Sequence, residues 1–431
     1  MGRGNLNPRA HLDTCPVSCS NTPVPSRYAD LTREELAVLV PELLLIGHLI
    51  DRSGMAFTIG AFGREVMAEI AIEEWAAASP IYTRRMQRAL QFQGDDVITI
   101  FKGLQFDIGA PPQFMDFRYT IHDRYDGEFH LDHCGALLDV EPMGEDYVRS
   151  MCHDIEDPTF DATAVATNPR AQIRPIHRPP RTPSDRHPHC AWTVKIDPTY
   201  PTAEPVPALA ENARSRAATL ELDPIDQADA GAGDYAGPLL DDVDFAAFSA
   251  SALRRLADET NLQMHLLNLA FLIALRARTG ADTAQFRDIA TRQLTGHAGL
   301  AAERLHRALR LPATPEGAAR LLELHPVFNP HAYVDVVRDG ATLQVRRSPA
   351  HEDGAWLSLC GPASLAPLQA MVRAVDPHFD VDVTGTDTDW NLAVVRRDSP
   401  APEAPEVQVT KFSGGATFQF QPRRSLPLTV L

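Results

Sequence analysis

The two most apolar stretches of the chain, residues 36–50 and 266–275, predict buried helices. Residues 32–54, TREELAVLVPELLLIGHLIDRSG, predict a buried helix. Thr32 is the expected N-cap, and Glu35, three residues later, completes a capping-box pattern. Ser79 and Pro80 match the N-cap and first position of a further helix, which we expect to begin there.

A sequence with alternating apolar and polar residues, typical of β-strands, follows the helical residues in each part of the chain. It lies at 114–134 and again at 332–347, and each stretch contains an Asp-Gly pair typical of a hairpin turn. A helix is expected next, near 143–156 and near 363–375, ending at an Asp-Pro in both places. The closing strands are CAWTVKI and DWNLAVV. Helices, hairpin, helix and strand make an α+β module.

The chain contains this module twice. YTRRMQRALQF (82–92) aligns with AAERLHRALRL (301–311), and IEDPTFDATAVA (155–166) aligns with AVDPHFDVDVTG (374–385), at one common spacing. We therefore predict two tandem copies of a module with a helical front and an antiparallel meander, packed as a pseudo-dimer within one chain. The predicted boundaries are 1–28 for a disordered tail, 29–197 for the first copy, which carries the site, 198–242 for an acidic Pro/Ala linker with one short helix near 207–220, 243–398 for a second, degenerate copy, and 399–431 for a tail with a hairpin around Gly414-Gly415.

The two copies differ in polarity at aligned positions, so the second copy serves as a control for the first. In the hairpin, three residues expected on one strand face align with residues of which two are apolar: His130, Asp132 and Cys134 against Leu343, Val345 and Arg347. In the following helix, three polar residues on one face align with three apolar ones: Arg149, His153 and Glu156 against Leu368, Val372 and Val375. One interpretation is that this face is simply solvated in the first copy. The other is that the first copy lines a polar pocket.

Composition narrows the function classes. The formal net charge is -17, which argues against broad nucleic-acid or anionic-membrane binding. No apolar run is long enough to span a membrane, and the N-terminal residues lack the apolar core of a signal peptide, so we expect a cytoplasmic protein. Cysteines are then expected to be reduced, and Cys15 and Cys19 fall in the predicted tail.

A basic, proline-rich stretch stands out in this acidic chain at residues 170–192. It is rich in arginine and histidine, and the second copy is 21 residues shorter there, counted between its Asp-Pro and the tryptophan that aligns with Trp192. Seven of the sixteen histidines and three of the six cysteines fall within residues 122–190. Imidazole and thiolate are the usual ligands of zinc and iron, so this concentration favours a metal site assembled by the fold.

The order of these elements resembles a known group of families. A strand ending in Cys134, a helix ending in IEDP, His177 in the loop and HCAWTVKI (189–196) together resemble the 4-vinyl-reductase-type small-molecule-binding domain and the related L-2-amino-thiazoline-4-carboxylate hydrolase-like family. Cys134 and Cys190 match two of the family's three cysteine positions, and His177 replaces the third. The resemblance implies small-molecule binding, or hydrolysis of a C–N bond in a small cyclic amidine-like substrate.

We therefore expect a metal-dependent enzyme, a hydrolase acting on a C–N bond of a small anionic molecule, with zinc or iron in the first copy. The expected metal ligands are Cys134, His177 and Cys190, with His130 or His133 as the fourth. Proton transfer is assigned to Asp132, Glu141 and His153. Substrate binding is assigned to the arginines Arg170, Arg174, Arg178 and Arg181, whose guanidinium groups suit carboxylates and phosphates.

Three alternatives stay open on the sequence. Without a metal, Cys134 is a candidate nucleophile with His130 on the same strand face. The chain is also compatible with a non-catalytic small-molecule sensor or assembly module. The third alternative is a structural metal, saturated by four protein ligands, that holds the long loop to the sheet.

Overall fold

The computed structural model describes residues 25–431. Residues 1–24, which include Cys15, Cys19 and most of the predicted tail, lie outside the described residues. The first half contains α1 (Arg33–Phe62), α2 (Arg64–Ala89), α3 (Val97–Leu104), β1 (Met115–Ile121), β2 (Asp126–Cys134), α4 (Gly135–Val140), α5 (Glu145–Arg149), a π-helix (Ser150–Ile155), α6 (Glu156–Ala164), β3 (Ala171–His177) and β4 (Cys190–Ile196). The second half contains α9 (Ala250–Thr279), α10 (Ala284–Leu309), α11 (Pro315–Leu324), β5 (Val336–Asp339), β6 (Thr342–Val345), α12 (Pro349–Glu352), α13 (Ala366–Arg373), β7 (Phe379–Gly385) and β8 (Trp390–Arg396).

Each half builds one four-stranded antiparallel sheet, which confirms the α+β class. The strand orders are β1-β2-β4-β3 and β5-β6-β8-β7, so the two sheets have the same topology. The leading helices also match, because α1 and α9 each have 30 residues and α2 and α10 each have 26. This correspondence is what a duplication predicts.

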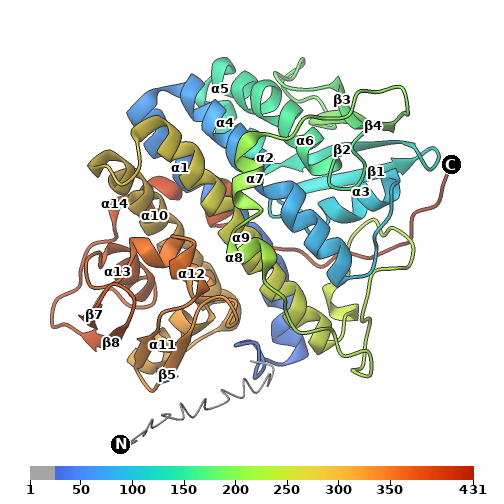
Figure 1. Ribbon diagram of the computed structural model, residues 1–431. Helices are drawn as coiled ribbons and strands as arrows, with labels where there is room; N and C mark the ends of the chain where they lie inside the picture. The colour runs from blue at the N-terminus through green and yellow to red at the C-terminus, as the bar shows by residue number, and fades with distance from the viewer. Residues whose placement is uncertain (1–24) are drawn as a thin grey trace, which may run out of the picture.

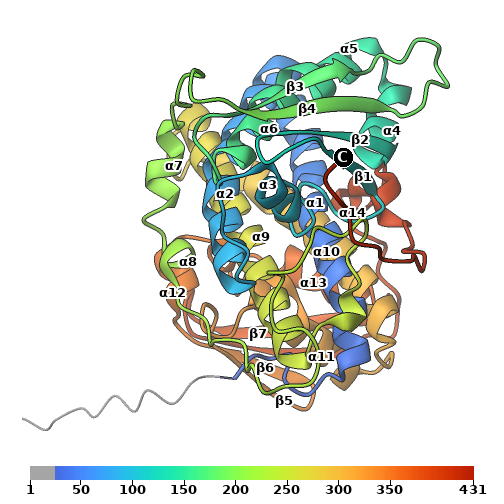
Figure 2. The same cartoon turned by 90° about the vertical axis from the view of Figure 1, so that its right-hand side faces the viewer.

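Four long helices separate the two sheets (Figures 1 and 2). Helix α2 packs against α9, and α1 packs against α10, so the main helix contacts join the two halves. Two buried ion pairs cross this interface: Arg85 Nε donates to Glu259 at 2.9 Å, and Arg304 Nε donates to Glu42 at 2.8 Å. Each half thus gives one arginine and receives one, a reciprocity that an isologous interface would produce. The pseudo-dimer itself stays a prediction.

The structure confirms one of the local helix predictions and contradicts two others. The capping box is confirmed, since Thr32 accepts from the backbone of Glu35 and Glu35 accepts in return. The helix start at Pro80 is wrong: α2 runs through this proline without a break. Packing of α2 against α9 outweighs the single backbone hydrogen bond that a proline removes. The helix near 143–156 also does not end at the Asp-Pro, because α6 continues beyond Pro158 to Ala164.

The segments outside the two sheets are more ordered than the sequence suggested. Between the halves, α7 (Pro207–Asn212) and α8 (Arg216–Thr219) confirm helix in the linker. After β8, α14 (Pro405–Thr410) packs on α10. The expected terminal hairpin is wrong, because Gly414–Ala416 form one turn of 3-10 helix and no strand pair follows it among the described residues.

The C-terminal segment (residues 417–431) returns to the first half, and the chain end lies beside β1 (Figure 1). Arg423 makes two bonds to Asp116, of 2.7 and 3.0 Å, and the Leu431 amide donates to the Ile121 carbonyl at 2.9 Å. Strand β1 is an edge strand, so this segment covers an edge that would otherwise be open to pairing.

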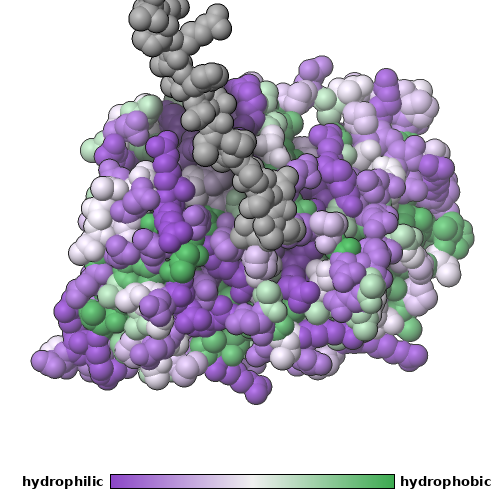
Figure 3. Space-filling view, turned by 60° about the horizontal axis from the view of Figure 1, so that its bottom comes forward, coloured by the Kyte–Doolittle hydropathy of each residue, from purple (hydrophilic) through white to green (hydrophobic). Residues whose placement is uncertain are grey.

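One face of the molecule shows how polar and apolar residues are distributed on the surface. The face in Figure 3 is mostly hydrophilic, with hydrophobic residues in small, separate patches. Among the described residues, no helix is both long and apolar enough to cross a bilayer.

Candidate functional site

The expected metal ligands lie on opposite faces of the first sheet. His130 and His177 both sit opposite Ala191 on the outer face, where His130 is 3.4 Å from Asp132. Cys134 is buried on the inner face. The prediction that His130, Asp132 and Cys134 share one face is wrong, because β2 has one extra residue between Leu131 and Cys134 relative to β1. Such a bulge turns the following side chain to the other face.

Three buried thiols lie behind the inner face of the sheet: Cys134, Cys152 and Cys190. Cys134 caps α4, with Sγ accepting from the Leu137 amide at 3.4 Å and lying 3.8 Å from Met115 Sδ. Burial raises the pKa of Cys134 to about 12 and that of Cys190 well above its usual value. Cys134 is therefore a neutral thiol near pH 7, which argues against the metal-free nucleophile.

The remaining candidates do not converge on a metal. His133 lies beside Phe418 and His189, with ring centroids 6.2 and 6.3 Å away. His153 Nε2 is 2.6 Å from the Pro179 carbonyl oxygen. Among residues 25–431, no group of three or more His, Cys, Asp or Glu side chains is placed to hold a metal ion.

The four arginines expected to bind substrate make internal contacts instead. Arg170 donates to the Tyr200 carbonyl, and the other three pair with carboxylates of the helical segment 141–164: Arg174 with Asp161, Arg178 with Asp157, and Arg181 with Glu141. The Arg181–Glu141 pair is bidentate, with bonds of 2.9 and 2.8 Å. The basic loop (residues 178–189) and the end of β3 thus hold this helical segment against the sheet. Their positions do not support a substrate-binding role for the four arginines.

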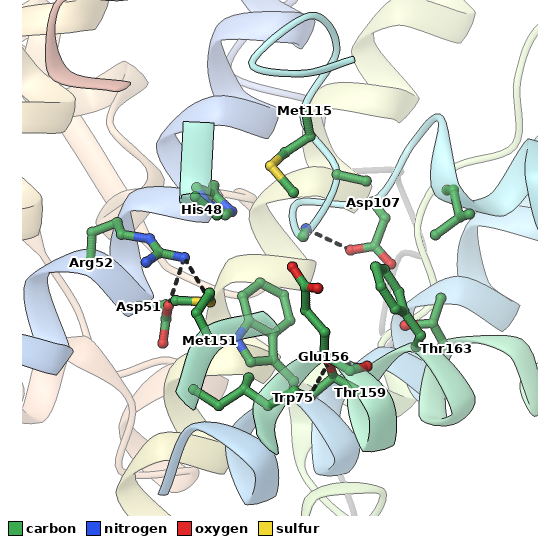
Figure 4. A pocket seen from close by; sticks show the side chains of 16 residues that line it. His48, Asp51, Arg52, Trp75, Asp107, Met115, Met151, Glu156, Thr159 and Thr163 are labelled. Atoms are coloured by element: carbon green, nitrogen blue, oxygen red, sulfur yellow. Dashed lines mark hydrogen bonds and ion pairs between the residues drawn. The ribbon is translucent and has the colours of Figure 1, made fainter. Parts of the chain in front are cut away.

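A cavity beside that helical segment gathers buried charged residues from three parts of the chain (Figure 4). We call it the α1–α6 cavity; water-sized spheres can occupy about 80 Å³ of it, which is room for several water molecules or a small ligand. Its polar lining residues come from α1, the turn after α3, and α6: His48, Asp51, Arg52, Asp107, Glu156, Thr159 and Thr163. Its apolar wall includes two aromatic rings: Trp75, Leu104, Met115, Met151, Ile155 and Phe160.

Local structure fixes the positions of these side chains. Asp107 Oδ1 accepts from the Gly109 amide and from the Tyr82 hydroxyl, each at 2.7 Å. This turn can approach α1 because a glycine faces it: a Cβ on Gly47 would lie 2.5 Å from Ile108. On the other wall, the π-helix turns Met151 and Ile155 toward the cavity just before Glu156. Helical insertions of this kind recur at functional sites.

Several of the buried polar atoms have no hydrogen-bond partner. They include Glu156 Oε2, Arg52 Nε and both ring nitrogens of His48. The Arg52 guanidinium lies 3.4 Å from Asp51 and donates to the sulfur atoms of Met55 and Met151 at 3.3 and 3.9 Å, which are weak acceptors. A buried polar group left unpaired costs about 1–3 kcal/mol, so this arrangement favours a bound partner in the cavity.

Burial also sets the protonation states. It raises the pKa of Glu156 to about 8, with Asp157 adding to the effect and Arg178 and Arg52 opposing it. It raises the pKa of Asp107 to about 6, with the two hydrogen bonds to Oδ1 limiting the rise. Near pH 7, Glu156 is therefore mostly an acid and Asp107 mostly a base. Two carboxyl groups whose pKa values are separated in this way are typical of general acid–base sites.

The corresponding positions of the second half are neutral. Counting back from the positive-φ glycines after α1 and α9, Asp51 and Arg52 align with Asn268 and Leu269. Glu156 aligns with Val375. Comparison of the two copies in sequence thus singled out Glu156. It missed Asp51 and Arg52 on α1, because a few polar residues on one face of an apolar helix are common in ordinary amphipathic helices.

Comparison of the chain with protein-family models, with curated proteins and with solved structures finds no match in any of the three. The family resemblance drawn from the sequence therefore stays a prediction.

Proposed function

We propose that the first half binds a small polar molecule in the α1–α6 cavity and performs general acid–base chemistry on it. One observation carries the proposal: buried, unpartnered polar atoms of His48, Arg52 and Glu156 line a cavity whose charged residues the second half replaces with neutral ones. Purely structural residues at these positions would leave the cost of burial without compensation. A bound molecule with donors and acceptors would supply the missing partners.

Hydrolysis of a C–N bond is the reaction class we propose for this site. Asp107 would take a proton from water as the water oxygen bonds to carbon. Glu156 would donate its proton to the departing nitrogen as the C–N bond breaks. This scheme uses the cavity residues rather than the dispersed His and Cys candidates, so it includes no metal at those positions.

The test uses Trp75, which lines the cavity, as a fluorescent reporter. A panel of small amides, ureas and cyclic amidines would be titrated into the protein, and ammonia or amine release would be followed in parallel. Tryptophan fluorescence is expected to change on binding, and the change should be absent in W75F. Two variants that introduce second-half residues, R52L and E156V, are expected to weaken binding at least tenfold, whereas E145Q on exposed α5 should bind normally.

Each outcome decides between the functions. Binding with product release supports the acid–base enzyme. Binding without turnover supports a small-molecule sensor instead. No fluorescence response to any panel member, or responses that R52L and E156V leave unchanged, would contradict the cavity as the binding site.

A further inference from the structure

We propose that the ligand of the α1–α6 cavity is a small zwitterion, a molecule that carries both a protonated amine and a carboxylate, as an α-amino acid does. This inference rests on the proposed function, because it names the class of molecule that the same site recognises. It is carried by the opposite hydrogen-bonding needs of Arg52 and Glu156, which line the same cavity.

Arg52 is a buried donor whose present acceptors are poor. Its side chain is 3% exposed, its Nε atom has no partner, and its terminal nitrogens contact methionine sulfur. Asp51, its neighbour on α1, is 3.4 Å away from one terminal nitrogen and leaves Nε unpaired. A carboxylate is the acceptor that a guanidinium fork matches best, because two parallel N–H donors meet two oxygens.

The acceptors lie toward the other side of the space (Figure 4). Glu156 is 9% exposed and its carboxyl group points into the cavity, with Oε2 unpartnered. Asp107 faces the same space (Figure 4). An ammonium group has three donors and no acceptor, so it satisfies such a set without leaving a donor of its own unpaired.

The number of carboxyl groups in the lining agrees with a ligand that brings several hydrogen-bond donors. Three carboxyl groups line the cavity, those of Asp51, Asp107 and Glu156, and Glu74 is buried close behind Asp51. Arg52 is the one lysine or arginine among the lining residues. A purely anionic ligand would leave the acceptor oxygens of these carboxyl groups without a donor, whereas a zwitterion would place its carboxylate at Arg52 and its ammonium beside Glu156.

The remaining wall defines the ligand's third part. Trp75 and Phe160 supply two aromatic faces, and Met115 and Met151 supply flexible apolar surface. An ammonium beside an aromatic face also gains cation–π attraction. The limited volume favours a short aliphatic side chain over a large ring.

A matched series of three ligands tests the inference by calorimetric titration at pH 7. L-Valine carries both charges, L-valinamide carries only the ammonium, and 3-methylbutanoate carries only the carboxylate. L-Valine is expected to bind at least tenfold more tightly than either analogue, since each analogue leaves either Arg52 or Glu156 without a hydrogen-bond partner.

Two variants assign each charge to its receptor. R52L should remove the preference for L-valine over L-valinamide, because the receptor for the carboxylate is gone. E156V should remove the preference for L-valine over 3-methylbutanoate, because the acceptor oxygens are gone. E145V on exposed α5 is the matched control for E156V and should keep both preferences. Should R52L fail to fold, the E156V comparison alone still decides whether an ammonium is recognised there.

The outcomes separate this inference from the proposed function. If L-valine binds no more tightly than both analogues, the zwitterion is refuted, and a panel compound that changes Trp75 fluorescence would still support the proposed function. If none of the three ligands binds, the inference is likewise refuted. If, in addition, the panel produces no response, the proposed function fails with it.

Discussion

Replacing Glu156 by glutamine should change how the stability of the protein depends on pH. Glu156 is the first residue of α6 and is 9% exposed, and burial raises its pKa from 4.5 to about 8. The charged groups that act on it are Asp157 on its own helix, Arg178 from the basic loop and Arg52 from α1. The thiols of Cys134, Cys152 and Cys190 also lie close to it. Glutamine has nearly the same shape and does not titrate.

The direction in which stability changes with pH follows from the number of protons that the folded and unfolded states bind. Between pH 4.5 and about 8 the folded state holds a proton on Glu156 that the unfolded state has lost. The corresponding stabilisation is complete below pH 4.5 and is lost as the pH rises through about 8. At about 1.4 kcal/mol for each pH unit, the full effect is roughly 5 kcal/mol, of which roughly 4 kcal/mol falls between pH 5 and pH 9. That is a large part of the 5–15 kcal/mol typical of folded proteins.

Urea unfolding of the wild type and E156Q, followed by tryptophan fluorescence at pH 5 to 9, measures this effect. The variant should gain roughly 4 kcal/mol relative to the wild type across that range, and E145Q should gain nothing. Asp107 titrates in both proteins, so its contribution cancels in the difference. A difference between wild type and E156Q that stays constant within about 1 kcal/mol would refute the assignment of a raised pKa to Glu156.

Three further predictions concern contacts between segments that are distant in the sequence. R304M removes the buried partner of Glu42 and should lower the free energy of unfolding by about 3–5 kcal/mol. The double variant E42Q/R304M should recover part of this loss. An equal loss in the double variant would show that the two residues are not coupled. R181A should cost about 1–2 kcal/mol and speed hydrogen exchange in residues 141–164, and unchanged exchange there would argue against a clasp by the basic loop. R423A should cost about 1 kcal/mol and speed exchange in β1 and the C-terminal segment, whereas exchange confined to the altered residue would argue that the segment is held by its other contacts.

The sequence was informative wherever a short-range pattern determines structure. The structure has the helix start, the strands and the repeated sheet topology that the sequence predicted. Each of these predictions used a pattern among residues that are close in the chain: the capping box at Thr32, the alternation along the strands, and the order of elements within each half. The break at Pro80 failed because a distant helix, α9, stabilises α2 through the proline. Local propensity is a weak guide where tertiary packing decides.

The candidate site failed for a related reason. Histidines and cysteines were grouped by their closeness in sequence and by strict strand alternation, but a single extra residue in β2 moves Cys134 to the face opposite His130. The α1–α6 cavity, by contrast, joins Arg52 with Glu156, which are far apart in the chain and have no shared motif. Of its charged residues, only Glu156 was visible beforehand, because the second copy has valine there.

The C-terminal segment has a consequence for synthesis of the chain. The first half carries the cavity, yet the edge of its sheet is covered by residues that are translated after the whole second half. During translation, β1 therefore leaves the ribosome with an open edge and keeps it until residues 423–431 emerge. Exposed edges of this kind are where nascent chains pair wrongly with one another. Ribosomes stalled before residue 423 should accordingly hold a first half that is folded around its helices but prone to aggregate through β1.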